Sequence, residues 1–120
     1  DVCSSDLLGD HHSELHIFWS NTLHSSNWKP ITQGNPVIFD SISARNGGFF
    51  YHNKTLYRIN QIQSKEHYGR SFGINEVIKM DEHCYVERSV SIIHPNFKSD
   101  ISSTHHFSSN ENLASVDFCR

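Results

Sequence analysis

The fold class follows from the stretch Phe49-Phe50-Tyr51-His52-Asn53-Lys54-Thr55-Leu56-Tyr57-Arg58-Ile59-Asn60-Gln61-Ile62. Its two apolar-rich runs, 49–52 and 55–62, are separated by only two residues, Asn53 and Lys54. Asparagine tolerates the positive φ that a two-residue hairpin turn requires. The stretch therefore predicts two antiparallel strands joined by a tight turn.

Two more β-like runs follow this hairpin. The longest periodic stretch, residues 68–80, opens with Tyr68-Gly69, and one face carries Phe72, Ile74, Ile78 and Met80 while the other carries Ser71, Gly73, Asn75 and Lys79. A period of two rather than 3.6 predicts a strand. A turn at 81–83 precedes the run 84–93, which His94-Pro95-Asn96 ends. The segment 48–93 thus predicts four consecutive antiparallel strands, the unit of one propeller blade.

Shorter strands are predicted on both sides of this segment. They are residues 14–20, 28–31, 37–39, 105–107 and 113–118. Pro30 suits an edge position, because proline cannot donate to a strand ladder. Strands arrive about every 8–15 residues and no helix of ordinary length is indicated, so the predicted fold class is all-β.

Composition and charge narrow the class of partner. We interpret residues 1–7 as a sequencing-adapter artefact and exclude them from the fold. Without Asp1 and Asp6 the acidic count falls from 13 to 11 against 10 basic side chains, so the formal net charge changes from −3 to −1. This balance argues against a nucleic-acid partner. The sequence shows no membrane-spanning apolar run and no secretory signal, which favours a cytoplasmic protein.

Cysteine and histidine spacing indicates neither a metal site nor a disulfide scaffold. Cys84 and Cys119, the cysteines outside 1–7, have no Cys-x-x-Cys spacing. The pairs His11-His12 and His105-His106 are adjacent, and adjacent strand residues point to opposite faces. We therefore predict no metal and no cofactor.

The polar candidate for ligand binding is Ala44-Arg45-Asn46-Gly47-Gly48, which leads directly into the first strand of the hairpin. It places a charged fork and an amide beside glycines that allow the backbone to turn sharply. The alternative is that the glycines serve only the turn and that Arg45 pairs with a nearby carboxylate.

A series of motifs runs in order along the chain. They are Gly9-Asp10-His11-His12-Ser13-Glu14-Leu15-His16-Ile17-Phe18-Trp19, Asn27-Trp28-Lys29-Pro30, Gly34-Asn35-Pro36-Val37, Ala44-Arg45-Asn46-Gly47-Gly48, Leu56-Tyr57-Arg58 with Gln61, Tyr68-Gly69-Arg70, Thr104-His105-His106-Phe107 and Val116-Asp117. Together they resemble the family named after the N-terminal domain of glucosamine inositolphosphorylceramide transferase. The resemblance covers nearly all of the chain after residue 7.

This resemblance implies a five-bladed β-propeller of the type shared with arabinanases, invertases and glycoside hydrolase family 43. Such a propeller needs about 250 residues, which makes this chain its C-terminal two-fifths, about two blades of four antiparallel strands. The expected parts are the end of the penultimate blade (8–36), the last blade (37–95) and closing strands (96–120), with the other blades N-terminal to them. The implied setting is a glycosyltransferase-like protein whose partner is a carbohydrate or a glycolipid head group.

The sequence departs from the family pattern at two places. Phe49 stands where an arginine commonly follows the two glycines, which removes a cation from the expected pocket. Ile59-Asn60 stands where a proline-glycine pair is common.

The innermost strand of each blade lines the channel of a propeller, so polar residues on or near it are the natural ligand contacts. The predicted ligand-binding residues are Arg45, Asn46, Arg58, Gln61, Tyr68, Arg70, His105 and His106. We favour Arg58 over Gln61, because the two have opposite parity on one strand. Tyr68 could instead pack between blades, and a partly buried structural histidine is the commoner role for the histidines.

No catalytic residue is assigned. A glycosidase needs two carboxylates separated by a sugar's width, whereas Glu76 has Ile74 and Ile78 beside it and Glu87 lies on a predicted outer strand. Neither acid is expected beside Arg45 and Asn46. Three functions remain open: recognition or processing of a glycan or glycolipid head group, a glycoside hydrolase-like enzyme with its acids in the N-terminal blades, and a non-catalytic structural or interaction propeller.

Overall fold

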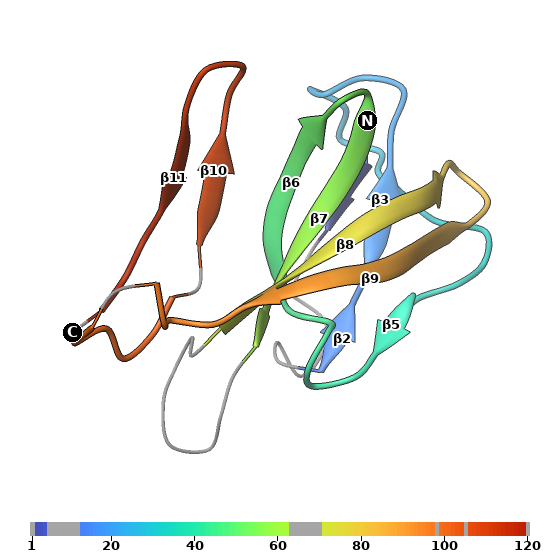
Figure 1. The fold of residues 1–120 in the computed structure, drawn as a ribbon. Coiled ribbons are helices and arrows are strands. Elements are labelled where there is room, and N and C mark those ends of the chain that lie inside the picture. Colours follow the sequence, from blue (N-terminus) through green and yellow to red (C-terminus); the bar gives the residue numbers. More distant parts are fainter. Residues whose placement is uncertain (1, 5–12, 63–70, 98, 105, 120) are drawn as a thin grey trace.

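The computed structural model describes residues 2–4, 13–62, 71–97, 99–104 and 106–119 (Figure 1). Within these residues the regular secondary structure consists of β-strands, so the predicted all-β class is confirmed. The strands are β1 (Val2–Ser4), β2 (Glu14–Leu15), β3 (Ile17–Trp19), β4 (Lys29–Pro30), β5 (Ile38–Phe39), β6 (Asn46–His52), β7 (Thr55–Ile62), β8 (Ser71–Met80), β9 (Tyr85–Ile93), β10 (Phe107–Ser109) and β11 (Ala114–Val116).

The largest unit is a sheet in which β6, β7, β8 and β9 are hydrogen-bonded in chain order, each antiparallel to the next. Asn53 and Lys54 form the β6–β7 turn at φ 47° and 64°. Positive values at both central residues are what a two-residue type I′ hairpin requires. The predicted hairpin and the predicted run of four antiparallel strands are both confirmed.

The N-terminal part forms two antiparallel pairs, β2 with β5 and β3 with β4, which together we call the ribbon. In it Leu15 lies opposite Ile38, and Phe18 lies opposite Pro30. The single strand predicted at 14–20 is wrong in one detail, because it is divided between β2 and β3. At the division, the Asn35 side chain accepts a hydrogen bond from the Ile17 N–H (2.8 Å) and donates one to the Ile17 carbonyl (3.0 Å). The β1 strand pairs with β3 as well.

The core lies between the ribbon and one face of the four-stranded sheet, which we call the ribbon face. It consists of Leu15, Ile17, Ile31, Ala44 and Tyr85, all at most 5% exposed. The ribbon is also tied to the β8–β9 turn by backbone bonds, from Thr32 N–H to the Glu82 carbonyl (3.0 Å) and from Gln33 N–H to the His83 carbonyl (2.7 Å). Apolar burial and backbone bonds thus fix the ribbon on the sheet.

The opposite face of the sheet, the hairpin face, carries aromatic side chains. β10 and β11 form a tail hairpin that stands beside β6 in Figure 1. The Phe107 ring of β10 lies 4.8 Å from the Phe50 ring and 6.2 Å from the Phe72 ring. Phe50 also stacks on Tyr57 with ring centroids 5.2 Å apart. Other β structure therefore packs against both faces of the four-stranded sheet.

The two faces predicted for β8 need a correction. Ser71 and Asn75, expected to point away from the core, are each 4% exposed, whereas Ile78, expected on the apolar face, is 54% exposed. Pairing with β7 is unbroken from Ser71 to Glu76, so Ser71 and Asn75 do lie on the face opposite Phe72 and Ile74, but that face is buried as well. Ile78 is the unpaired residue of a β-bulge against β9, between Val77 and Lys79, and the bulge changes the alternation there.

Candidate functional site

The segment that leads into β6 is held in a tight turn by Asp40. One Asp40 carboxylate oxygen accepts the Ile42 N–H (3.0 Å), the other accepts the Ser43 hydroxyl, and the Asp40 carbonyl accepts the Ala44 N–H (2.9 Å). Hydrogen bonds from Ser43 and then from the Ile42 backbone hold the pKa of Asp40 below its usual value. These bonds fix the backbone conformation of the turn that precedes Arg45 and Asn46.

Arg58, on β7, is 0% exposed, and its side chain binds the backbone of this segment. Its guanidinium donates to the Ser43 carbonyl (2.5 Å) and, at 3.5 Å, to the Ala44 carbonyl. Its Nε and Nη2 also donate to the two carboxylate oxygens of Glu87, both at 2.7 Å. A planar fork bound bidentately to a carboxylate is a geometry specific to arginine. The structure thus places the Arg58 side chain against the backbone just before Arg45 and Asn46. Its guanidinium donors are hydrogen-bonded to other groups of the protein.

Two buried asparagines continue the network along the same face. Asn60 donates to the Ile42 carbonyl (2.8 Å), and Asn75 donates to the Asn60 side-chain carbonyl (2.7 Å) and to the Arg58 backbone carbonyl (3.2 Å). Both are at most 4% exposed. Arg58 and Asn60 are two residues apart on one strand, so they share a face. The two-residue spacing of Arg58 and Asn60 was therefore a signal for this network in the sequence. Our sequence analysis missed that signal.

Tyr85 completes the network at Glu87. Its hydroxyl donates to Glu87 Oε2 at 2.5 Å, the oxygen that also accepts Arg58 Nε. Burial raises the pKa of Tyr85 far above its usual value, the hydrogen bond and the charge of Glu87 raise it further, and the charge of Arg58 acts in the opposite direction. The buried phenol is therefore held in its protonated form.

This shift predicts a loss of stability in alkali. The unfolded tyrosine ionises near pH 10, below the pKa in the folded state. The contribution to the free energy of unfolding is therefore complete below about pH 10 and is lost as the pH rises above it. Tyr85→Phe should make the urea midpoint less dependent on pH between about 10 and 12. An equal alkaline slope in the parent and in Tyr85→Phe would contradict this assignment, with Tyr51→Phe, at a tyrosine 72% exposed, as the control.

The glycines of the predicted motif do not form the turn that we expected. Asn46, Gly47 and Gly48 already belong to β6, where the register to β7 shifts between Asn46 and Gly48. Gly48 has φ 112°, a value that residues with a Cβ atom rarely adopt. The two glycines thus make a β-bulge at the start of the strand rather than a loop before it.

The bulge, together with the backbone bonds around it, fixes where the predicted ligand residues lie. Arg45 and Asn46 are half-buried at the start of β6 and also interact elsewhere in the chain. The Arg45 carbonyl accepts the Gln61 N–H (2.9 Å), so the structure brings Arg45, Asn46 and Gln61 together. Within the described residues, the buried Gln61 side-chain carbonyl oxygen has no hydrogen-bond partner.

The remaining predicted residues lie apart from this group or outside the description. Tyr68, Arg70 and His105 are among the residues that the structure does not describe. His106 is exposed on the tail, where its backbone N–H donates to the Asp117 carboxylate (2.8 Å).

Both acids considered for catalysis are ion-paired. Glu76 accepts the Arg88 guanidinium, and Glu87 accepts Arg58. Glu87 is linked to the segment just before Arg45 and Asn46 through Arg58, which donates to the Ser43 carbonyl. Tyr85 and Glu87, two residues apart on the outer strand β9, both take part in this network. We therefore assign Glu87 a structural part in the site.

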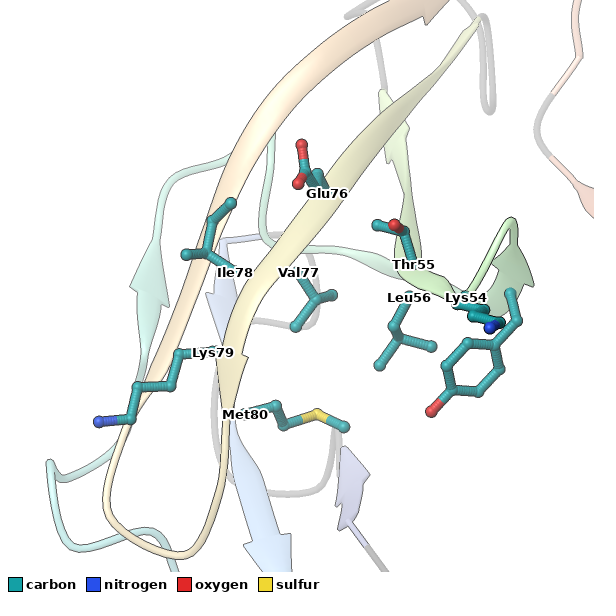
Figure 2. A pocket seen from close by; sticks show the side chains of 9 residues that line it. Lys54, Thr55, Leu56, Glu76, Val77, Ile78, Lys79 and Met80 are labelled. Atoms are coloured by element: carbon teal, nitrogen blue, oxygen red, sulfur yellow. The ribbon is translucent and has the colours of Figure 1, made fainter.

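A groove of about 430 Å³ lies at the β6–β7 turn end of the sheet (Figure 2). In Figure 2 the apolar side chains of Leu56, Val77 and Met80 lie toward one another, whereas that of Lys79 extends away from them. The groove contains none of the predicted ligand-binding residues.

The described residues offer neither a cluster of metal ligands nor a membrane-spanning helix. In this part of the chain no three histidine, cysteine, aspartate or glutamate residues lie close enough together to hold a metal ion. It also contains no helix of the length and apolarity that a membrane crossing requires.

Comparison with known proteins gives one match. No curated protein and no solved structure is significantly similar to the chain. The family described as "Glucosamine inositolphosphorylceramide transferase 1, N-terminal" matches residues 4–111. This match spans most of the 120 residues and includes the Arg45–Asn46 segment, the four-stranded sheet and the network beneath them. The chain therefore belongs to the family of the N-terminal domain of glucosamine inositolphosphorylceramide transferase 1.

Proposed function

We propose that this domain recognises the sugar or phosphate part of a glycan or glycolipid head group, as a β-propeller domain of a glycosyltransferase-like protein. The observation that carries the proposal is the family match over 4–111, since the family is named after a transferase acting on glucosamine and inositolphosphorylceramide. The four-stranded antiparallel sheet, with β structure packed on both faces, supports the propeller architecture.

The Arg45–Asn46 segment is the proposed contact surface. A guanidinium binds phosphate and carboxylate bidentately, and an amide both donates to and accepts from sugar hydroxyls. The Asp40 turn, the Arg58 guanidinium and the Asn60 amide hold the backbone just before these residues. A backbone fixed in advance lowers the entropy lost on binding.

Arg45→Ala tests this proposal. We expect the complete protein to bind N-acetylglucosamine, its uridine diphosphate conjugate or myo-inositol 1-phosphate in calorimetric titrations. The substitution should lower the affinity for the tightest-binding of these three compounds by about tenfold or more, because a charge-assisted hydrogen bond contributes about 1.5–3 kcal/mol.

The matched control is Arg88→Ala, which removes the same charge from an exposed position on β9. It should leave the affinity unchanged, and melting curves of both variants check that each is folded. Unchanged affinity in Arg45→Ala, or no binding of any of the three compounds, would refute the proposed site.

A further inference from the structure

A second pocket lies away from Arg45, at the loop that joins β3 to β4. It has a volume of about 250 Å³ and is lined by Trp19, Ser20, Asn21, Thr22, Ser25, Asn27 and Lys29. Pockets for drug-sized ligands measure about 300–1,000 Å³. The volume is therefore suited to a ligand the size of one monosaccharide unit.

The loop is shaped by its own hydrogen bonds. The Ser20 hydroxyl oxygen accepts the Thr22 N–H (3.3 Å), and the Thr22 carbonyl accepts the Ser25 N–H (3.3 Å). The Ser25 hydroxyl oxygen accepts the Asn27 N–H (3.0 Å). The serine side chains hold the backbone, which leaves the side chains of Asn21, Thr22 and Asn27 for other contacts.

The chemistry of the lining is that of a sugar site. Trp19 and Lys29 lie opposite each other on β3 and β4, and the Lys29 ammonium is 5.4 Å from the Trp19 ring centroid. Among the described residues, none forms a hydrogen bond with the side-chain amide of Asn21 or of Asn27. An indole offers an apolar surface to sugar C–H groups, and amides satisfy hydroxyls as both donors and acceptors.

The charge of the lining restricts the ligand further. Among the described residues that line the pocket, Lys29 is the one cation and none is acidic. A ligand with an ammonium group would meet like charge without compensation, whereas a carboxylate would pair with Lys29. We propose that Trp19, Asn21, Asn27 and Lys29 form a second saccharide site, for a neutral or anionic sugar unit. This site does not depend on the function proposed for Arg45.

Ligand-observed NMR titration tests the inference with N-acetylglucosamine, glucuronate and glucosamine, each added to the complete protein carrying Arg45→Ala, so that binding at the site proposed above does not contribute. We expect the neutral and the anionic sugar to bind, and glucosamine, which carries an ammonium group, to bind at least about tenfold more weakly. The combined variant Asn21→Ala with Asn27→Ala should weaken the two binding sugars by about tenfold or more, since it removes both amides from exposed positions.

Two controls separate this site from others. Asn112→Ala removes an exposed amide from the tail turn and should not change the affinity of this pocket, and the Arg45→Ala background excludes binding at the site proposed above. The inference is overturned if neither N-acetylglucosamine nor glucuronate binds or if glucosamine binds as tightly as they do. It is also overturned if the combined substitution Asn21→Ala with Asn27→Ala leaves these affinities unchanged.

Discussion

Glu87→Ala is expected to lower the free energy of unfolding by about 3–5 kcal/mol, because it leaves a buried guanidinium without its counterion. The Arg58 side chain is 0% exposed and that of Glu87 is 10% exposed, so water cannot replace the lost carboxylate. The two carbonyls that Arg58 still contacts carry only partial charges. Urea unfolding of the parent and the variant, followed by circular dichroism, measures the change.

The sheet offers a matched control for this substitution. Glu76→Ala also breaks an arginine–glutamate pair between β8 and β9, but the Arg88 side chain is 69% exposed. Exposed pairs contribute about 0–1 kcal/mol, so this variant should remain close to the parent. If Glu87→Ala is no more destabilised than Glu76→Ala, the buried pair does not stabilise the fold as argued.

A double substitution distinguishes the loss of an ion pair from general damage to the core. Replacing both partners, as Arg58→Met with Glu87→Leu, removes both buried charges together. Apolar replacement of a buried pair is often neutral or stabilising. We expect the double variant to be more stable than Glu87→Ala alone. Its Ser43 and Ala44 carbonyls lose a donor, so the start of β6 should exchange amide hydrogens faster than in the parent.

The sequence was informative where local chemistry decides the structure. The Asn53-Lys54 turn and the four antiparallel strands after it were predictable, because turn residues and a period of two act within a few residues. Arg45 and Asn46 were chosen from the sequence as ligand-contact candidates, and their role stays a proposal. The family could be recognised from motifs spread along the chain, which no single strand carries.

Register shifts and buried polar groups were not predictable in this way. A β-bulge changes which face a residue occupies without changing its neighbours in sequence, so Ile78 was expected inside. Asn75 was expected outside because the sequence does not reveal that other strands cover both faces of β8. The role of Arg58 follows from Glu87, 29 residues further along the chain and two strands away. An arginine on a strand is read as a ligand contact or as a buried pair only once its partner is known. The two roles differ in what the arginine does for binding. An arginine that contacts the ligand binds it directly, whereas a buried arginine positions the residues that bind.

Gly73→Ala is expected to cost at least about 2 kcal/mol, from overpacking and from the hydrogen bonds that the clash disrupts. A Cβ at Gly73 would lie 2.3 Å from Asn60 Oδ1 and 3.0 Å from Asn60 Cγ. To make room, the Asn60 amide would have to leave its bonds to Asn75 and to the Ile42 carbonyl. The variant should therefore both melt at a lower temperature and bind more weakly at the Arg45–Asn46 segment.

The Asn60→Ala background identifies the cause. There the clashing atoms are absent, so Gly73→Ala should cost much less than in the parent, and the two substitutions should be strongly non-additive. An additive result in thermal unfolding would contradict the contact between Gly73 and Asn60. Because Asn60 reaches Ile42 and Arg58 reaches Ser43, a methyl group on β8 would act on the proposed site through β7. The absence of a side chain at residue 73 thus belongs to the arrangement that orients Arg45 and Asn46.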